Sequence, residues 1–233
     1  LLIQEDGSWS FDPSASAYQS LAAGETKTIS ITYRVTDPNG GSDTSTFSVT
    51  VLGTNDNPVA LYNNETPDQT FSANEGDQSI RGQLEASDPD LTDNTKLIYS
   101  LVGTTVDGER VEPHGLSISE TGAWTFDPSD PAYQSLAEGE DKVINVTYAV
   151  ADGNGGVDTN SFSITITGTN DDPTATYSAS SIVLEGRASD VINGQLLAID
   201  PDQTDNNDLR YSLVSVDGIE IQQDSDVDGL GLL

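Results

Sequence analysis

Apolar and polar residues alternate with a period of two along several stretches of the chain. Residues 144–150 read INVTYAV, residues 162–166 read FSITI, and residues 97–101 read LIYSL. A β-strand with one face in a core and one face in water has this alternation. Clusters of Gly, Asn, Asp and Pro separate the stretches, and no window has the spacing of an amphipathic helix. The pattern therefore predicts an all-β protein.

Turn and aromatic residues refine this prediction. Asn154-Gly155-Gly156 lies between two alternating stretches and predicts a hairpin turn. Trp124 and Phe126 lie in the alternating run GAWTF, which indicates core aromatics rather than a ligand-binding platform. ERVEPHG, at 109–115, is interpreted as a loop. About seven short strands in about 115 residues are typical of an antiparallel β-sandwich.

The chain also repeats itself. Residues 1–58 align with residues 116–173 without a gap, with 36 identities in 58 positions. The remaining part repeats with small changes in length, since GQLEASDPDLTDN at 82–94 matches GQLLAIDPDQTDN at 194–206. A period of this length corresponds to a whole domain and exceeds that of a solenoid repeat.

The hexapeptides GTNDNP (53–58) and GTNDDP (168–173) are interpreted as junctions between repeats. Residues 59–172 then form one complete repeat, residues 1–58 the C-terminal half of a preceding repeat, and residues 173–233 the N-terminal half of a following one. We expect the chain to be part of a longer secreted protein. A half-sandwich leaves strand edges and apolar faces uncovered. The C-terminal half of one chain is therefore expected to pair with the N-terminal half of the next, through a covalent continuation or by head-to-tail self-assembly.

The charge of the chain restricts its partners. It carries 39 acidic against 8 basic side chains, a formal net charge of −31. Nucleic acids and anionic membrane surfaces attract basic proteins, so neither is an expected partner. The absence of cysteine excludes disulfides and thiolate zinc sites. No apolar run approaches about 18 residues, so no membrane insertion is expected.

Three acidic motifs and one glutamate recur with the repeat. They are the Asn-Asp-Asn or Asn-Asp-Asp of each junction, the Asp-Pro-Asp that follows it, the hairpin aspartate (Asp37 and Asp152), and a glutamate (Glu75 and Glu185). Ca²⁺ takes about six to eight oxygen ligands from carboxylates, amides and backbone carbonyls. Gathered carboxylates repel one another and need a counter-ion. The alternative is that these are ordinary turn residues on a solvated surface, because Asp, Asn and Gly are common in turns.

The order of these motifs resembles that of a cadherin repeat: NDNP, the Glu of NEGD, ASDPDLTDN, YSL, AVADG, and a last strand that ends in NDDP. FDPSDPAYQSL and DGNGG resemble more closely the bacterial cadherin-like repeats of large RTX-type surface adhesins, also called VCBS repeats. This resemblance covers the whole chain. It implies tandem antiparallel β-sandwiches of the cadherin or immunoglobulin type, with Ca²⁺ between them. The Leu-Asp-Arg-Glu motif of cadherins is missing, and FDPS, with Asp12 and Asp127, stands roughly in its place.

The resemblance also implies a set of calcium ligands for each junction. The first set is Asn55, Asp56, Asn57, Asp88, Asp90, Asn94 and Asp152. The second set is Glu75, Asn170, Asp171, Asp172, Asp200, Asp202 and Asn206. A further candidate is DSDVDG, at 224–229, which has the start of an EF-hand calcium loop. A solvated acidic loop is the equal alternative there.

Signals for catalysis are weak. His114, the single histidine, lies in the polar segment EPHG and is interpreted as a surface residue, and no G-x-S-x-G elbow occurs. No enzymatic activity is expected. The chain is interpreted as a structural extender of a calcium-rigidified adhesin or filament, outside the cell or on a bacterial surface. The alternative is a β-sandwich that binds carbohydrate or another cell surface, which would group exposed aromatic residues on one face.

Overall fold

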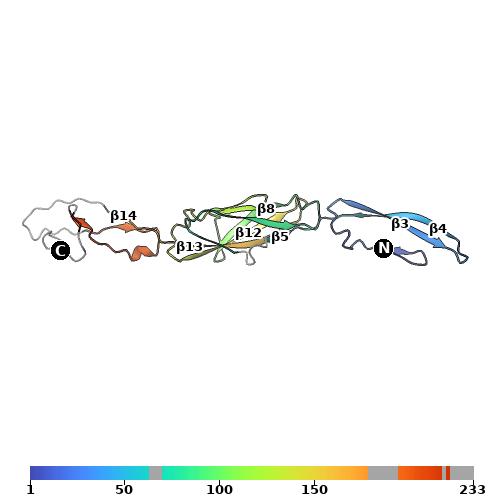
Figure 1. Cartoon of the computed structure of the whole chain (residues 1–233), viewed down its shortest axis with the longest axis horizontal. Helices are drawn as coiled ribbons and strands as arrows, with labels where there is room; N and C mark the ends of the chain where they lie inside the picture. Colours follow the sequence, from blue (N-terminus) through green and yellow to red (C-terminus); the bar gives the residue numbers. More distant parts are fainter. Residues whose placement is uncertain (63–69, 178–193, 217–218, 221–233) are drawn as a thin grey trace, which may run out of the picture.

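The computed structural model describes residues 1–62, 70–177, 194–216 and 219–220. These residues form three parts that follow one another along a line (Figure 1). The N-terminal part comprises residues 1–53, and the C-terminal part comprises the described residues from 174 onward. They lie on opposite sides of the middle part, which is the largest. Strand-free connections at residues 53–58 and 168–173 join the three parts.

The middle part holds nine strands among the described residues, two more than the sequence pattern predicts. They are β5 (Val59–Tyr62), β6 (Thr70–Asn74), β7 (Ile80–Ser87), β8 (Ile98–Val106), β9 (Glu109–Val111), β10 (Leu116–Ile118), β11 (Ala123–Phe126), β12 (Asp141–Ala151) and β13 (Val157–Thr167). The interpretation of residues 109–115 as a loop was wrong for residues 109–111, which form β9. This strand has three residues, too few to give an alternating pattern, and it pairs with the edge of β8.

These strands form two sheets. One has the order β10-β11-β7-β5 and the other the order β6-β13-β12-β8-β9. All pairs are antiparallel except β6 with β13, which is parallel. β12 and β13 pair over eleven residues each and are joined by the predicted turn at Asn154-Gly155-Gly156, where Gly155 has a positive φ of 111°. The predicted all-β sandwich is therefore confirmed.

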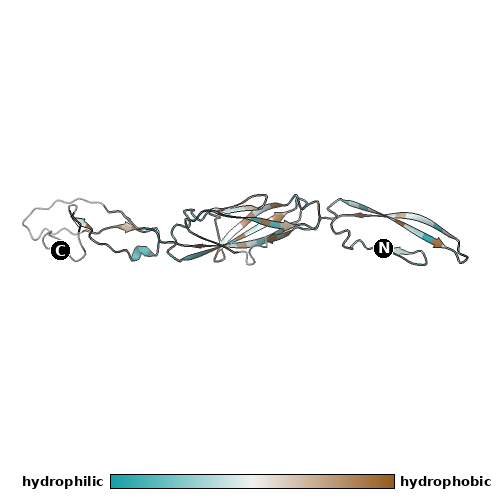
Figure 2. Cartoon of the chain, in the orientation of Figure 1, coloured by the Kyte–Doolittle hydropathy of each residue, from teal (hydrophilic) through white to brown (hydrophobic). Residues whose placement is uncertain are grey.

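The core lies between the two sheets. Trp124 and Phe126 are buried, as predicted, and face residues such as Val146 and Ile164 of the other sheet. The Trp124 ring lies 4.8 Å from that of Phe71 and 5.0 Å from that of Phe162, between centroids. Figure 2 shows hydrophobic residues in brown along the strands of the middle part. The alternation in the sequence thus corresponds to one face turned inward on each strand.

The N-terminal part has the strands of the second half of a sandwich. They are β1 (Leu2–Ile3), β2 (Trp9–Ser10), β3 (Thr26–Thr36) and β4 (Ser42–Leu52). β3 pairs with β4 in the register of β12 with β13, and β1 pairs with β2 in the register of β10 with β11, at positions 115 residues apart. Sequence identity between the two regions is therefore matched by identical pairing.

The C-terminal part has strands that correspond to the first half of a sandwich. Its described elements are β14 (Thr174–Ala175), β15 (Ala198–Ile199), the 3₁₀-helix η1 (Asp205–Asn207), β16 (Ser215–Val216) and β17 (Ile219–Glu220). The pair Thr174 and Ile199 corresponds to Val59 and Ser87, so β14 and β15 keep the register of β5 and β7. Among the described residues, no helix has the length and apolar character needed to span a bilayer.

Candidate metal centres at the two junctions

A short acidic loop follows β7 and approaches the first junction. The backbone N–H of Asp88 donates to Oδ1 of Asn94 at 2.8 Å, and Nδ2 of Asn94 donates to the Asp88 carbonyl at 2.8 Å. The N–H of Asp90 donates to Oδ1 of Asp88 at 2.8 Å. Asn94 therefore closes the loop, and the loop in turn fixes the carboxylates of Asp88 and Asp90, both of which are buried.

The linker between the N-terminal and middle parts meets this loop and the β12–β13 turn. The N–H of Asp56 donates to Oδ2 of Asp90 at 2.9 Å, and Nδ2 of Asn55 donates to Oδ2 of Asp152 at 2.8 Å. A Cβ at Gly156 would lie 3.0 Å from Oδ1 of Asn57 and would clash with Oδ2 of Asp152. These contacts gather oxygen atoms from three segments distant in the sequence.

Three of these oxygens are buried without a hydrogen-bond partner: Oδ1 of Asn55, Oδ2 of Asp88 and Oδ1 of Asp90. Burial raises the pKa of Asp88, and the charges of Asp90, Asp152 and Asp93 raise it further, against a backbone hydrogen bond from Asp90 that lowers it. Several carboxylates therefore lie close enough to repel one another at this junction, and a cation there would relieve the repulsion.

The pKa of Asp152 is shifted in the opposite direction. Burial raises it, but hydrogen bonds from Asn55 and from backbone N–H groups of the turn outweigh burial, so the pKa falls below its usual value. Oδ1 of Asp152 accepts from the N–H groups of Asn154 at 2.6 Å and Gly156 at 3.0 Å. Asp152 is thus held as a carboxylate by the hairpin turn that carries it.

The second junction repeats this geometry. The N–H of Asp200 donates to Oδ1 of Asn206 at 2.9 Å, and the N–H of Asp202 donates to Oδ1 of Asp200 at 3.0 Å. The N–H of Asp171 donates to Oδ2 of Asp202 at 3.0 Å, as that of Asp56 does to Asp90. Asp200 and Asp202 are buried. The loop and the linker are therefore held together by the same contacts in both repeats.

Glu75 adds a carboxylate from the middle part to the second junction. It follows β6 directly, and its Oε1 accepts from the N–H of Thr169 at 2.6 Å. Carboxylate oxygens of Glu75, Asp171 and Asp202 all lie within 4.8 Å of one another. Oε2 of Glu75 and Oδ1 of Asp202 are buried without a hydrogen-bond partner. This group of three carboxylates could hold a metal ion.

Other residues of the two predicted ligand sets lie around these clusters in different roles. Asn94 and Asn206 brace the acidic loops through both atoms of their amides. Nδ2 of Asn170 donates to the Asp171 carbonyl at 3.0 Å, and Asp172 is exposed at the edge of the junction. The side chains best placed for a metal are therefore Asp88 and Asp90 at the first junction, and Glu75, Asp171 and Asp202 at the second.

The structure adds Asp93, which the sequence argument missed, to the first junction. Its side chain is fully buried and accepts from Nζ of Lys96 and from Nδ2 of Asn154, each at 2.8 Å. The sequence did contain a signal that could have pointed to Asp93, because its segment, DLTDN, recurs in the next repeat as DQTDN.

Two other acidic motifs have local roles. Asp158 accepts from the N–H of Ala60 at 2.9 Å and so ties β13 to the start of β5. Oδ1 of Asp127, in FDPS, accepts from the N–H of Ser129 at 3.0 Å and closes a turn. The EF-hand-like segment at 224–229, with Asp224, Asp226 and Asp228, lies outside the described residues.

Comparisons with known proteins agree with this architecture. Residues 1–50 and 55–165 match a family described as bacterial Ig domain. A relative, the calcium-binding lectin RapA2 of Rhizobium johnstonii, is 26% identical over 178 residues, which cover 72% of this chain and 71% of the relative. Neither the description of this family nor the name of this relative describes an enzyme.

Solved structures of cadherins also match. The protocadherin gammaB7 EC3-6 cis-dimer is 17% identical with a TM-score of 0.41, over 77% of this chain and 45% of that chain. The human desmocollin-1 ectodomain is 19% identical with a TM-score of 0.39, over 84% and 34%. The chain thus spans less than half the length of these solved chains. Since the family match covers more than half of this chain, the chain belongs to the bacterial Ig domain family, in agreement with the cadherin-like repeat predicted from its sequence.

Proposed function

We propose that this chain is an extender segment of an extracellular bacterial adhesin or filament, in which Ca²⁺ at each junction fixes one repeat against the next. The observation that carries the proposal is the set of buried carboxylate oxygens without a hydrogen-bond partner, Oδ2 of Asp88 and Oδ1 of Asp90 at one junction and Oε2 of Glu75 and Oδ1 of Asp202 at the other. A buried charge without a partner is strongly unfavourable. A bound cation would provide the missing partner.

The chemistry of the donors favours calcium over other cations. All candidate ligands at the two junctions are oxygen atoms from Asp, Asn and Glu, as hard cations prefer. Ca²⁺ accepts irregular sets of about six to eight oxygens, whereas Mg²⁺ requires a near-ideal octahedron and keeps several waters. Zinc would favour Cys or His, and the chain has no cysteine and a single histidine. The name of the relative, a calcium-binding lectin, points in the same direction.

The proposed mechanism is electrostatic. Without a cation, carboxylates from the linker and from the acidic loop repel each other across the junction, which favours open and flexible arrangements. With Ca²⁺ they share one centre, and the linker becomes stiff. Residues 59–172 act as one complete repeat, with residues 1–58 and 173–233 as halves of its neighbours. Extracellular calcium modules bind at about 10⁻⁴–10⁻³ M, so the rod would stiffen at the calcium concentrations found outside cells.

A second candidate function is carbohydrate binding. It is favoured by the word lectin in the relative's name and by the exposed Trp9 and Tyr33 of the N-terminal part. The corresponding residues of the middle part, Trp124 and Tyr148, are core residues. The aromatic face is therefore explained by the strand pattern of the repeat, and the extender remains the preferred function.

Thermal unfolding in calcium and in EDTA tests the proposal. The melting temperature should rise with free calcium, as mass action requires. The rise should be reduced in Asp88→Ala/Asp90→Ala and kept in the control Glu85→Ala/Glu109→Ala, which removes two exposed carboxylates from strands. Small-angle scattering should show a longer and stiffer particle in calcium. A particle equally stiff in EDTA would refute the extender, and glycan binding by the intact chain would favour the alternative.

A further inference from the structure

We propose that Asn154 is a modification site, at which spontaneous loss of the side-chain amide releases the β12–β13 turn from the acidic loop of the first junction. Asn154 is exposed to water and is followed by Gly155. An asparagine before a glycine closes readily onto the next backbone nitrogen, because glycine has no side chain to obstruct the approach. The modification converts a neutral hydrogen-bond donor into a carboxylate.

The turn itself requires this pair of residues. Gly155 has a φ of 111°, a conformation that glycine adopts without strain and other residues rarely adopt. Nδ2 of Asn154 donates to Oδ2 of Asp93 at 2.8 Å. An aspartate at position 154 could not make this bond, because an ionised carboxylate only accepts hydrogen bonds. The backbone of the turn and its contact with the loop therefore select Asn-Gly, the same pair that is chemically labile.

The reaction is intramolecular. The backbone nitrogen of Gly155 attacks Cγ of Asn154 and forms a cyclic imide. The bond between Cγ and Nδ2 breaks, and the amide nitrogen leaves as ammonia with the proton lost from the Gly155 N–H. Water then opens the imide at either of its carbonyl carbons. One opening gives aspartate, and the other gives isoaspartate, which carries the main chain through the former side chain.

The folded turn occupies both reacting groups. The amide of Asn154 is held by Asp93, and the backbone N–H of Asn154 donates to Oδ1 of Asp152 at 2.6 Å. The N–H of Gly155, from which the attacking nitrogen comes, also helps to lower the pKa of the Asp152 carboxyl. The reaction therefore proceeds from turns that have opened locally, and its rate follows the population of that open form.

The modification acts on the junction through Asp93. This side chain is fully buried, and its Oδ1 already accepts from Nζ of Lys96 at 2.8 Å. Loss of the Asn154 amide removes the donor to Oδ2 and places a second carboxylate beside it. A buried carboxylate that loses a donor and gains a like charge is strongly unfavourable. The turn is therefore expected to move away from the loop.

The linker is bonded to both of the segments that would separate. Nδ2 of Asn55 donates to Oδ2 of Asp152 on the turn, and the N–H of Asp56 donates to Oδ2 of Asp90 on the loop. Modified chains should therefore have a looser first junction. This effect requires no cation, so it is measured in EDTA. Its failure would leave the calcium proposal standing, and a missing calcium response would leave the modification standing.

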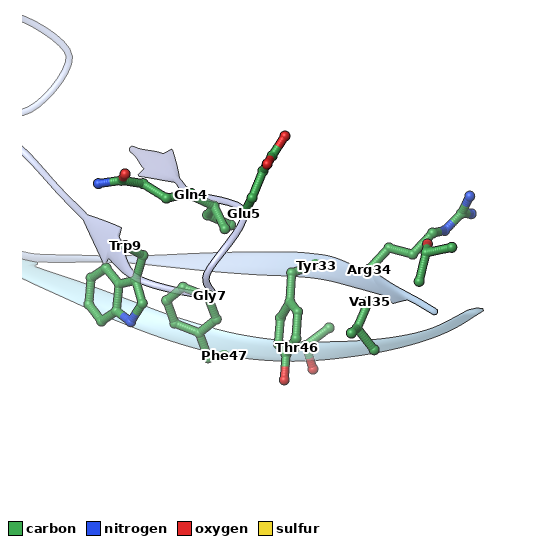
Figure 3. Close-up of a pocket in the computed structure, with 11 residues that line it drawn as sticks. Gln4, Glu5, Gly7, Trp9, Tyr33, Arg34, Val35, Thr46 and Phe47 are labelled. Carbon is green, nitrogen blue, oxygen red and sulfur yellow. The ribbon is translucent and has the colours of Figure 1, made fainter. Parts of the chain in front are cut away.

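The chain provides an internal reference for the chemistry. Asn39-Gly40-Gly41 joins β3 to β4, and Figure 3 shows these two strands side by side. Gly40 has a φ of 92°, and the N–H of Asn39 donates to Oδ1 of Asp37 at 2.8 Å, which is the arrangement of the β12–β13 turn. Conversion of Asn39 therefore reports whether the conditions used are sufficient for deamidation.

Site-resolved mass spectrometry of the 233-residue chain, incubated in EDTA at mildly alkaline pH, is the first test. We expect aspartate and isoaspartate to accumulate at position 154. Asp93→Ala, compared below its unfolding transition, should convert about threefold to tenfold faster, because it loses one hydrogen bond that keeps the turn closed. Glu109→Ala, which removes an exposed carboxylate from β9, should convert as wild type. An Asn154 that stays intact while Asn39 converts would overturn the proposal, as would an unchanged rate in Asp93→Ala.

The effect on the junction is tested with Asn154→Asp, which has the charge of the modified chain. Its melting temperature in EDTA should be lower than that of wild type by roughly 4–8 °C. Asn145→Asp is the matched control, because it adds the same charge to β12 at an exposed side chain that accepts from Oγ of Ser163. An aspartate can accept that bond equally well, so the control should melt as wild type. Equal melting temperatures for the two variants would overturn the proposed release of the turn.

Discussion

The backbone N–H of Asp171 donates a 3.0 Å hydrogen bond to Oδ2 of Asp202, while Oδ1 of the same carboxylate is buried with no partner. One oxygen thus holds the linker to the loop, and the other is left without a partner in a side chain that lies in a group with Asp171 and Glu75. The structural role of Asp202 and its proposed cation-binding role are therefore separable. Replacements that keep the shape of the side chain can remove one without the other.

Asp202→Asn should weaken calcium binding with little change of fold. The amide oxygen can still accept from Asp171, but one negative charge is lost. At calcium 100-fold above Kd, the wild type should gain about 2.7 kcal/mol of stability, and a tenfold loss of affinity would lower this gain to about 1.4 kcal/mol. Denaturant unfolding at fixed free calcium measures it. Asp208→Asn, exposed in the same loop, is the control and should behave as wild type.

Glu75→Gln should loosen the second junction. Glu75 comes from the middle part, whereas Asp202 belongs to the C-terminal part, so the glutamate is the proposed ligand that spans the junction. A glutamine can keep the hydrogen bond from Thr169 but contributes no charge. We expect the variant to scatter in calcium as a more flexible particle than wild type. Glu138→Gln, which changes an exposed glutamate, should scatter as wild type; an equally stiff Glu75→Gln particle would argue against calcium bridging.

Lys96→Gln should make the first junction more dependent on calcium. Nζ of Lys96 lies 2.8 Å from Oδ1 of the fully buried Asp93, and this hydrogen bond is the main cause of the raised pKa of Lys96. The second repeat has Asp208 at the corresponding position. Without the lysine, we expect a melting temperature lowered by a few degrees in EDTA and a larger rise on adding calcium. Lys27→Gln, on the N-terminal part, is the control. An unchanged calcium response would show that Asp93 lies outside the influence of the cation.

Much of the fold could be predicted from period-two alternation and the internal repeat. Trp124 sits in the core, and Asn154-Gly155-Gly156 turns the hairpin, because both signals are local: a strand face and a turn that needs positive φ. β9 was missed because its pairing with β8 is a tertiary event that three residues do not encode. The parallel pairing of β6 with β13 is likewise invisible to alternation.

The candidate sites could be predicted as motifs but not as geometry. The recurrence of Asp-Pro-Asp indicated acidic loops, yet the burial of Asp93 depends on Asn154, 61 residues later in the chain. The sequence also gave no means to separate Asn94, which braces the loop, from Asp90, which faces the junction. That distinction depends on which side-chain atoms already form hydrogen bonds with the backbone, as both amide atoms of Asn94 do.

Tyr133→Phe should lower stability at neutral pH and remove part of the alkaline unfolding of the protein. Oη of the buried Tyr133 donates to the His114 carbonyl at 2.8 Å, and loss of this bond should cost about 1 kcal/mol.

Burial, with a smaller effect of Asp130, raises the pKa of Tyr133 to about 12. The folded state thus holds a proton that the unfolded state releases near pH 10. The stabilisation by Tyr133 is complete below about pH 10 and is lost as the pH rises toward 12. Unfolding between pH 9 and about 12 should therefore be less steep in pH for Tyr133→Phe than for wild type, and unchanged for Tyr18→Phe in the N-terminal part.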